Sequence, residues 1–83
     1  MKLIKMGSSW CSGCAVQEAL LKHLNVLDKF EYIDIDVDME TPLKYGVRSI
    51  PQLLAVDEND NVIASLAGGA TKEQILDMVG KYG

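Results

Sequence analysis

Both cysteines of this chain lie in one short segment, Trp10-Cys11-Ser12-Gly13-Cys14, with two residues between them. Residues 1–6 before it form a mostly apolar run of strand length, and Gly7-Ser8-Ser9 interrupts that run. Apolar residues then recur at helical spacing, which predicts that the segment joins a strand to the first turn of a helix. The unpaired amides and the dipole of that turn favour an anion, so a thiol there loses its proton more readily. A thiolate attacks disulfides, and a second thiol one turn away can resolve the mixed disulfide that forms.

Zinc binding is the main alternative for a CxxC motif. A structural zinc site needs about four ligands, and this chain has two cysteines and one histidine, His23. A zinc site would therefore have to be shared between two copies, as a zinc-bridged dimer. A purely structural disulfide is a weak explanation, because so small a loop constrains the unfolded chain little. The motif favours redox chemistry with no metal and no organic cofactor, since the two sulfurs themselves carry it.

The size and charge of the chain limit the remaining possibilities. Its 83 residues suffice for one domain with one modest core, so we expect a single domain spanning residues 1–83. The sequence shows neither a secretory signal nor an apolar run of membrane-spanning length, and we therefore expect a cytoplasmic protein. In that compartment a CxxC motif is more often catalytic than structural. The net charge of −4 provides no electrostatic reason to bind nucleic acid or an anionic membrane, and we expect a monomer.

The first half of the chain predicts two helices and a second strand. The first helix is expected over residues 11–28, and its apolar stripe consists of Val16, Leu20, Leu24 and Leu27. Residues 31–37 alternate apolar and polar side chains, which predicts an edge strand with aspartates on its wet face. Thr41-Pro42 is typical of a helix N-cap followed by proline at the first helical position. This short helix should end near residues 45–46.

The second half predicts a hairpin. Residues 51–56 have the apolar composition of a buried strand, and residues 57–61 are rich in turn-forming side chains. Residues 62–66 should therefore return as a second strand, antiparallel to the first. Gly68-Gly69 is expected to end that strand.

A last helix should close the chain. Thr71 and Gln74 are spaced as a capping box. The apolar stripe that follows them consists of Ile75, Met78, Val79 and Tyr82. The predicted order is β-α-β-α-β-β-α, and its strand–helix–strand start implies a right-handed crossover with parallel pairing. We therefore expect an α/β fold, a four-stranded mixed sheet with helices on both faces, in which the first strand is central and the aspartate-bearing strand lies at an edge.

Pro51 is the second informative position. It opens a predicted strand, where a missing N–H is tolerated. Taken locally, an ordinary trans proline is the simpler interpretation, because only about 5–6% of X–Pro bonds in folded proteins are cis. A cis bond after Ile50 would instead place a backbone edge beside the dithiol, where an extended substrate chain could pair with it.

The motifs in combination resemble a known family. The chain resembles the thioredoxin family over nearly its whole length. The resemblance is carried by Trp10-Cys11-x-x-Cys14 after a first strand, then by residues 44–51 (KYGVRSIP), a hairpin and Gly68. The resemblance implies a thioredoxin-like fold and a thiol–disulfide oxidoreductase that reduces protein disulfides. It implies Cys11 as the exposed nucleophile and Cys14 as the buried resolving thiol. The substrate-contacting residues that it implies are Trp10, Ile50, a cis Pro51 and Gly68.

The family also implies partners, and two alternatives remain open. The expected partners are disulfide-containing proteins and an upstream donor similar to thioredoxin reductase. The chain has the compact size of a glutaredoxin, and Gly68-Gly69 is similar to the glycine pair of that family, so a glutathione-coupled reductase is one alternative. A thioredoxin-fold binding module with incidental cysteines is the other. The pair Ser12-Gly13 differs from the Gly-Pro of thioredoxins and the Pro-Tyr of glutaredoxins, which leaves the redox potential open.

Lys5 departs from the family pattern. It stands six residues before Cys11, where thioredoxins usually have a buried aspartate that assists proton transfer at the resolving thiol. One interpretation is a lysine at a strand end whose ammonium reaches water. The other is a pKa-tuning cation near Cys14, paired with Asp34 on the neighbouring strand. A nearby cation favours the thiolate, whereas a nearby carboxylate disfavours it.

Overall fold

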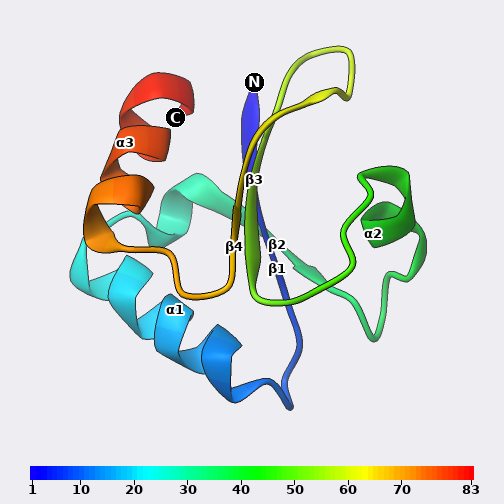
Figure 1. Ribbon diagram of the computed structural model, residues 1–83, viewed down its shortest axis with the longest axis horizontal. Helices are drawn as coiled ribbons and strands as arrows, with labels where there is room; N and C mark the ends of the chain where they lie inside the picture. Colours follow the sequence, from blue (N-terminus) through cyan, green and yellow to red (C-terminus); the bar gives the residue numbers. More distant parts are fainter.

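The strands and helices follow one another along the chain in the predicted order (Figure 1). The computed structural model describes residues 1–83. Its elements are β1 (Lys2–Gly7), α1 (Ser12–His23), a 3₁₀ turn (Leu27–Lys29), β2 (Phe30–Asp34), α2 (Glu40–Lys44), β3 (Gln52–Val56), β4 (Val62–Ala67) and α3 (Lys72–Tyr82). None of the helices has the length and apolar character needed to cross a membrane.

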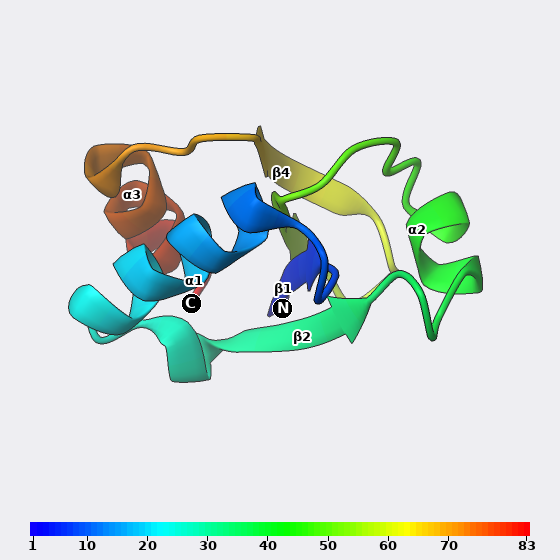
Figure 2. The same ribbon diagram turned by 90° about the horizontal axis from the view of Figure 1, so that it is seen from below.

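The four strands form one mixed sheet in the order β2-β1-β3-β4. β1 is parallel to β2 and antiparallel to β3, and β3 forms an antiparallel hairpin with β4. Figure 2 shows α1 and α3 on one face of the sheet and α2 on the other. The fold class is therefore confirmed, including the central first strand, the edge position of the second strand and the helices on both faces.

The core has two parts because the central strands are buried on both faces. Neighbouring residues of a strand point to opposite faces, so the apolar runs of β1 and β3 supply both parts. The part beneath α1 and α3 includes Leu3, Leu21, Leu53 and Ile75. The part beneath α2 consists of Ile4, Met6, Val47, Leu54 and Val56. Lys5 is the one charged residue on the buried part of β1. It lies on the face of the strand that α1 covers, and only 3% of it is exposed.

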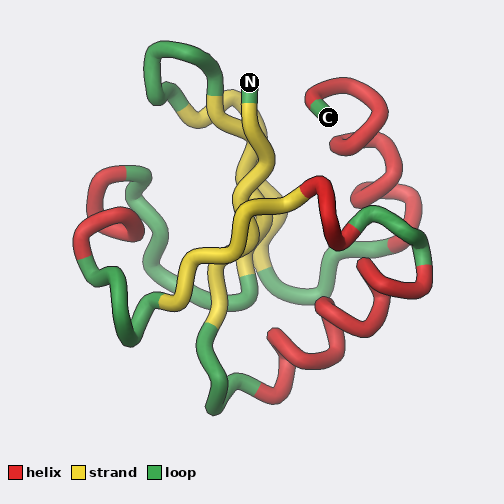
Figure 3. The backbone as a smooth tube through the Cα atoms, turned by 180° about the vertical axis from the view of Figure 1, so that it is seen from behind, coloured by secondary structure: helices red, strands yellow, loops and turns green.

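Three connections meet at one end of the sheet. Figure 3 shows both chain termini at the opposite end, while the β1–α1, α2–β3 and β4–α3 segments lie together below the strands. The β1–α1 segment carries the cysteines, the α2–β3 segment carries Pro51, and the β4–α3 segment carries Gly68. The topology thus gathers residues from three distant parts of the sequence.

The first helix is shorter than predicted. α1 ends at His23 instead of continuing to residue 28, because Asn25 adopts a left-handed conformation with φ of 62°. The amide of Val26 donates to the carbonyl of Leu21, and the amide of Asn25 donates to that of Lys22. These two bonds form the Schellman arrangement that ends many helices, for which asparagine is a suitable residue.

The apolar stripe predicted for this helix is wrong at its first member. Val16 is 71% exposed, and the buried residues of α1 are Cys14, Gln17 and Leu21. The remaining predicted members, Leu20, Leu24 and Leu27, are only partly buried. The helix therefore turns a face displaced by about one residue toward the sheet.

Two predicted boundaries around α2 are also wrong, for one local reason. β2 ends at Asp34, because its carboxylate accepts a hydrogen bond from the amide of Asp36 and turns the chain. Val37, predicted on the buried face, is 82% exposed. The carboxylate of Asp38 then accepts from the amides at the start of α2, so it provides the cap predicted for Thr41. The aspartates of the alternating run therefore form turns and a cap instead of the wet face of a strand.

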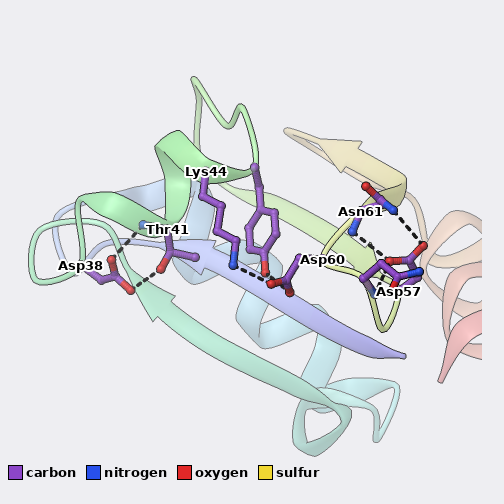
Figure 4. A network of polar contacts seen from close by, with 8 residues as sticks. Asp38, Thr41, Lys44, Asp57, Asp60 and Asn61 are labelled. Atoms are coloured by element: carbon purple, nitrogen blue, oxygen red, sulfur yellow. Dashed lines mark hydrogen bonds and ion pairs between the residues drawn. The ribbon is translucent and has the colours of Figure 1, made fainter.

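Polar contacts hold α2 against the β3–β4 hairpin (Figure 4). The carboxylate of Asp60, at the tip of the hairpin, accepts hydrogen bonds from Lys44 Nζ at 2.7 Å and from the Tyr45 hydroxyl at 3.1 Å. Hydrogen bonding to Lys44 is the main cause that lowers the pKa of Asp60. Asp57 accepts from the amide of Asn61 and closes the same turn, as predicted. The predicted capping box of α3 is likewise present.

Candidate active site

The two thiols occupy different environments at the start of α1. Cys11 is the N-cap and is partly exposed, whereas Cys14 is 4% exposed; both are free thiols. The amide of Cys14 donates a hydrogen bond to Cys11 Sγ at 3.1 Å. An amide at the N-terminus of the helix therefore points directly at the Cys11 sulfur. The geometry provides one accessible nucleophile and one protected thiol a turn away.

Cys14 packs directly on the end of β1. A Cβ placed on Gly7 would lie 3.0 Å from Cys14 Sγ, so the strand can approach the thiol only because residue 7 has no side chain. Burial is the largest cause that raises the pKa of the Cys14 thiol above 9.0, followed by its hydrogen bond with Cys11. The backbone of Ser8 and the Lys5 ammonium oppose that rise. Cys14 is thus held as a thiol whose proton must be removed before it can attack.

Pro51 lies against the dithiol segment. The Ile50–Pro51 peptide bond is cis, and a Cβ on Gly13 would contact Pro51 Cδ at 3.4 Å. The carbonyl of Pro51 accepts a hydrogen bond from the amide of Gly68 at 3.0 Å. A Cβ on Gly68 would meet no atom within 4 Å, so its surroundings are open. The structure therefore brings together the segments that carry Cys11, Pro51 and Gly68.

Trp10 lies beside the dithiol and is 69% exposed. Its ring nitrogen Nε1 donates a hydrogen bond to Asp36 Oδ2 at 2.8 Å. This bond fixes a large apolar surface next to Cys11 by tying it to the loop after β2. The hydrogen bond between Trp10 and Asp36 was not predicted, because the alternating pattern had assigned this aspartate to a strand face.

Two grooves lie near the dithiol segment, and Cys11 itself lines the first of them. The first, the Ile50 groove, has a volume of about 370 Å³ and is lined by Trp10, Cys11, Ile35, Val47, Arg48 and Ile50. The second, the Gly68 groove, has a volume of about 240 Å³ and is lined by Gly13, Val16, Gln17, Pro51, Gly68 and Gly69. Most of their lining is apolar, which suits the side chains on either side of a reacting cysteine. Val16, which is exposed on α1, lines the second groove.

The structure contradicts part of each interpretation of Lys5, the lysine that reaches water and the cation paired with Asp34. Its side chain is 4% exposed, so it does not reach water as a strand-end lysine would. Its ammonium is not paired with Asp34; Nζ lies 4.0 Å from Glu18 Oε1 and 4.4 Å from the centre of the Tyr32 ring. The strand register explains this, since Lys5 is opposite Tyr32 and Asp34 is opposite Gly7.

A third hollow connects Lys5 with the cysteines. This Cys14 cleft has a volume of about 210 Å³ and is lined by Lys5, Ser8, Cys11, Cys14, Glu18 and Tyr32. Sequence reasoning missed Glu18, although its spacing of four residues from Cys14 places the two on one face of a helix. It also missed Ser8, whose buried hydroxyl has no hydrogen-bond partner.

Comparison with known proteins decides the family. The family model for thioredoxin matches residues 1–81. The chain belongs to the thioredoxin family. It is 36% identical to a thioredoxin of Bacillus subtilis over 77 residues, covering 88% of this chain and 73% of that protein. It is 30% identical to a thioredoxin of Haemophilus influenzae over 84 residues, covering 96% and 78%.

A solved thioredoxin structure agrees with the sequence comparison. A reduced thioredoxin pre-protein of Schistosoma mansoni superposes with a TM-score of 0.78 at 26% identity, covering 98% of this chain and 77% of that one. This thioredoxin-family chain is accordingly a thiol–disulfide oxidoreductase, as the CxxC motif and the resemblance predicted. Its site therefore serves the exchange of thiols with disulfides.

Proposed function

We propose that this thioredoxin-family protein reduces disulfides of protein substrates through Cys11 and Cys14. The Cys11 thiolate attacks one sulfur of the target disulfide, a new S–S bond forms, and the other target sulfur leaves as a thiolate. Cys14 then loses its proton and attacks Cys11 Sγ, which breaks the mixed disulfide and releases the second target sulfur. The target gains two electrons, its two leaving thiolates take up protons, one equivalent to that lost by Cys14 and one from water, and the protein is left with a Cys11–Cys14 disulfide.

The different exposure of the two thiols is the observation that carries this proposal. Cys11 is accessible and accepts an amide hydrogen bond, whereas Cys14 is 4% exposed and its pKa is raised, chiefly by burial. A substrate can therefore meet only Cys11, and Cys14 acts afterwards within the protein. This order requires no metal or organic cofactor.

The substrate segment is proposed to bind across the two grooves. The backbone at Ile50, just before the cis Pro51, supplies an edge with which an extended chain can pair. Trp10 offers its exposed ring on one side, and the open space at Gly68 admits the chain on the other. Pairing through the backbone explains how one site could accept disulfides in different sequences.

The remaining roles concern charge and supply of electrons. Lys5 is proposed to favour the Cys14 thiolate, because its buried ammonium lowers the pKa that burial raises. We propose a monomer that works in the cytoplasm, where a reducing environment keeps such a dithiol reduced. A reductase of the thioredoxin-reductase type is the proposed donor, with glutathione as the alternative.

Trapping of the mixed disulfide tests the order of the two thiols. Cys14→Ser should accumulate a covalent adduct with a small disulfide-bonded protein, whereas Cys11→Ser should form none. Ser12→Ala, which leaves both sulfurs in place, is the matched control and should turn over without accumulating an adduct. Adduct formation in Cys11→Ser but not in Cys14→Ser would overturn the assignment.

The reduction potential of the couple tests the direction of electron flow. A value near about −270 mV fits a general reductant, and one near about −200 to −230 mV fits the glutathione-coupled alternative. A value of about −120 to −180 mV would contradict a reducing role. Reduction of the oxidised protein by glutathione alone, compared with a thioredoxin reductase, separates the two donors.

A further inference from the structure

The Cys14 cleft contains charged groups that the dithiol exchange, as described so far, does not use. Lys5 Nζ has no hydrogen-bond acceptor in range, and its nearest carboxylate oxygen, Glu18 Oε1, lies 4.0 Å away. The Ser8 hydroxyl beside the same cleft is buried and unpartnered. At about 210 Å³ the cleft has space for several water molecules, each of which occupies about 30 Å³ in the liquid. A buried ammonium and a polar cleft of this kind are suited to moving a proton.

Cys14 requires a proton acceptor at its own step. Its thiol is buried and its pKa is raised, chiefly by burial, so few molecules hold the thiolate near neutral pH. The Cys14 cleft, which Cys14 lines together with the half-exposed Glu18, joins the buried sulfur to the surface. The structure therefore offers this cleft as the path by which the proton leaves.

Glu18 is the carboxylate positioned to accept that proton. It follows Cys14 by four residues on α1, which places both side chains on one face of the helix. Both residues line the Cys14 cleft. The Glu18 side chain is 48% exposed, so one end of it meets bulk water while the other meets the buried cleft. A group in this position can take a proton inside and release it outside.

We propose that Glu18 is the general base for Cys14, and that Lys5 is a positioning residue that holds the Glu18 carboxylate at the cleft. This proposal rests on the proposed function. The S–H bond of Cys14 breaks and its proton passes through the cleft to Glu18. Cys14 Sγ forms the bond to Cys11 Sγ, the bond between Cys11 Sγ and the substrate sulfur breaks, and the substrate leaves as a thiolate. Glu18 then releases the proton to water.

Tyr32 completes the arrangement from the neighbouring strand. Its ring lies 4.4 Å from Lys5 Nζ and attracts the ammonium through a cation–π contact. The titratable groups that face the Cys14 cleft are Lys5 from β1, Tyr32 from β2, and Cys11, Cys14 and Glu18 from α1. Asp34 and Asp36 do not line the cleft, but both help to raise the pKa of Tyr32, of which burial is the main cause. Glu18 is thus the one carboxylate among the lining residues.

Stopped-flow reaction with the aromatic disulfide DTNB separates the two thiol steps. The reduced protein releases one coloured thiolate when Cys11 attacks, at a rate proportional to the DTNB concentration. It releases a second when Cys14 resolves the adduct, at a rate independent of that concentration. General-base catalysis contributes about 10²–10⁴-fold, so Glu18→Gln should slow the second phase at least about tenfold at pH 7 and leave the first phase unchanged.

The pH profile distinguishes a base from a structural residue. The slowing in Glu18→Gln should shrink as the pH rises toward the ionisation of Cys14 itself, because a thiolate needs no base. Glu18→Asp should recover part of the rate, since it restores a carboxylate. Glu31→Gln is the matched control: it removes the same charge from β2, on the strand face opposite to Tyr32, and should leave both phases unchanged.

Each outcome has one meaning. A second phase equally fast in Glu18→Gln at every pH would overturn the role of Glu18, while the second release would still support the proposed function. Slowing by a constant factor at all pH values would also overturn it, because that is the result of a shifted structure. Absence of any second release in the unmodified protein would overturn the proposed function itself.

Discussion

Replacing Lys5 with methionine is expected to stabilise the protein. The Lys5 side chain is 4% exposed, and its ammonium has one carboxylate oxygen at 4.0 Å and one aromatic ring at 4.4 Å. Removing an ammonium from water costs several kcal/mol, even after the protein relaxes around it. Methionine has a similar length and fills the same space among apolar neighbours without that cost.

The contacts that lysine makes offset only part of the cost. A cation–π contact contributes about 0.5–2 kcal/mol. The ion pair with Glu18 orients the carboxylate but adds little to stability, because the carboxylate is 48% exposed and no hydrogen bond joins the two groups. Exchanging a buried charge of this kind for an apolar side chain is often neutral or stabilising by about 1–4 kcal/mol. We therefore expect Lys5→Met to raise the free energy of unfolding by about 1–2 kcal/mol. The Tm should rise by about 4–8 °C for each kcal/mol in a domain of this size.

Urea unfolding followed by far-UV circular dichroism measures this difference. Lys2→Met is the matched control, because it makes the same change at an exposed position of the same strand and should stay within about 0.5 kcal/mol. A loss of 1 kcal/mol or more in Lys5→Met would refute the reasoning, since the ammonium would then be held by contacts stronger than its desolvation. A gain in stability together with slower resolution by Cys14 would show that the charge is kept for the reaction.

Three further substitutions test the packing and the electrostatics. Leu21→Ala removes a wholly buried side chain from the core beneath α1 and should lower the unfolding free energy by about 3–4 kcal/mol in urea; a loss below about 1 kcal/mol would contradict the packing. Gly7→Ala would place a Cβ 3.0 Å from Cys14 Sγ, so we expect a loss of about 1–3 kcal/mol, and an unchanged Tm would show that α1 can move away. The pKa of Asp60 is lowered, mainly by its hydrogen bond from Lys44, so its stabilising effect is complete above pH 3.8 and is lost as the pH falls through the lowered value. Asp60→Asn should make the acid side of the stability–pH curve shallower in urea titrations, and an unchanged curve would exclude this contribution.

Much of the fold followed from patterns that are local in the sequence. The apolar runs before Gly7 and after Pro51 predicted the two central strands, and the turn-forming residues 57–61 predicted the hairpin between β3 and β4. Thr71 and Gln74 predicted the start of α3 by their spacing alone. These signals are reliable because hydrogen bonds and periodic burial act over a few neighbouring residues.

The sequence patterns were less reliable where one residue type has several uses. The aspartates of residues 34–38 alternate as they would on a strand, yet Asp34 forms a turn and Asp38 caps α2. Aspartate favours turns and helix caps and is tolerated on the wet face of a strand, so only the path of the chain selects among these positions. Asn25 could have shown that α1 ends early, since asparagine tolerates the left-handed conformation that ends a helix.

By itself, the sequence determined the order of elements and the family, and it singled out the two sulfurs proposed to exchange electrons, because each depends on residues that stand close together in the chain. Only the tertiary structure decided which groups surround those sulfurs. Lys5 meets Glu18 and Tyr32 instead of Asp34 because the register of β1 with β2, and the face that α1 turns toward the sheet, are set by packing between distant segments. Local patterns do not settle either one: the apolar stripe predicted the buried face of α1 only to within about one residue, and packing against the sheet decided the rest.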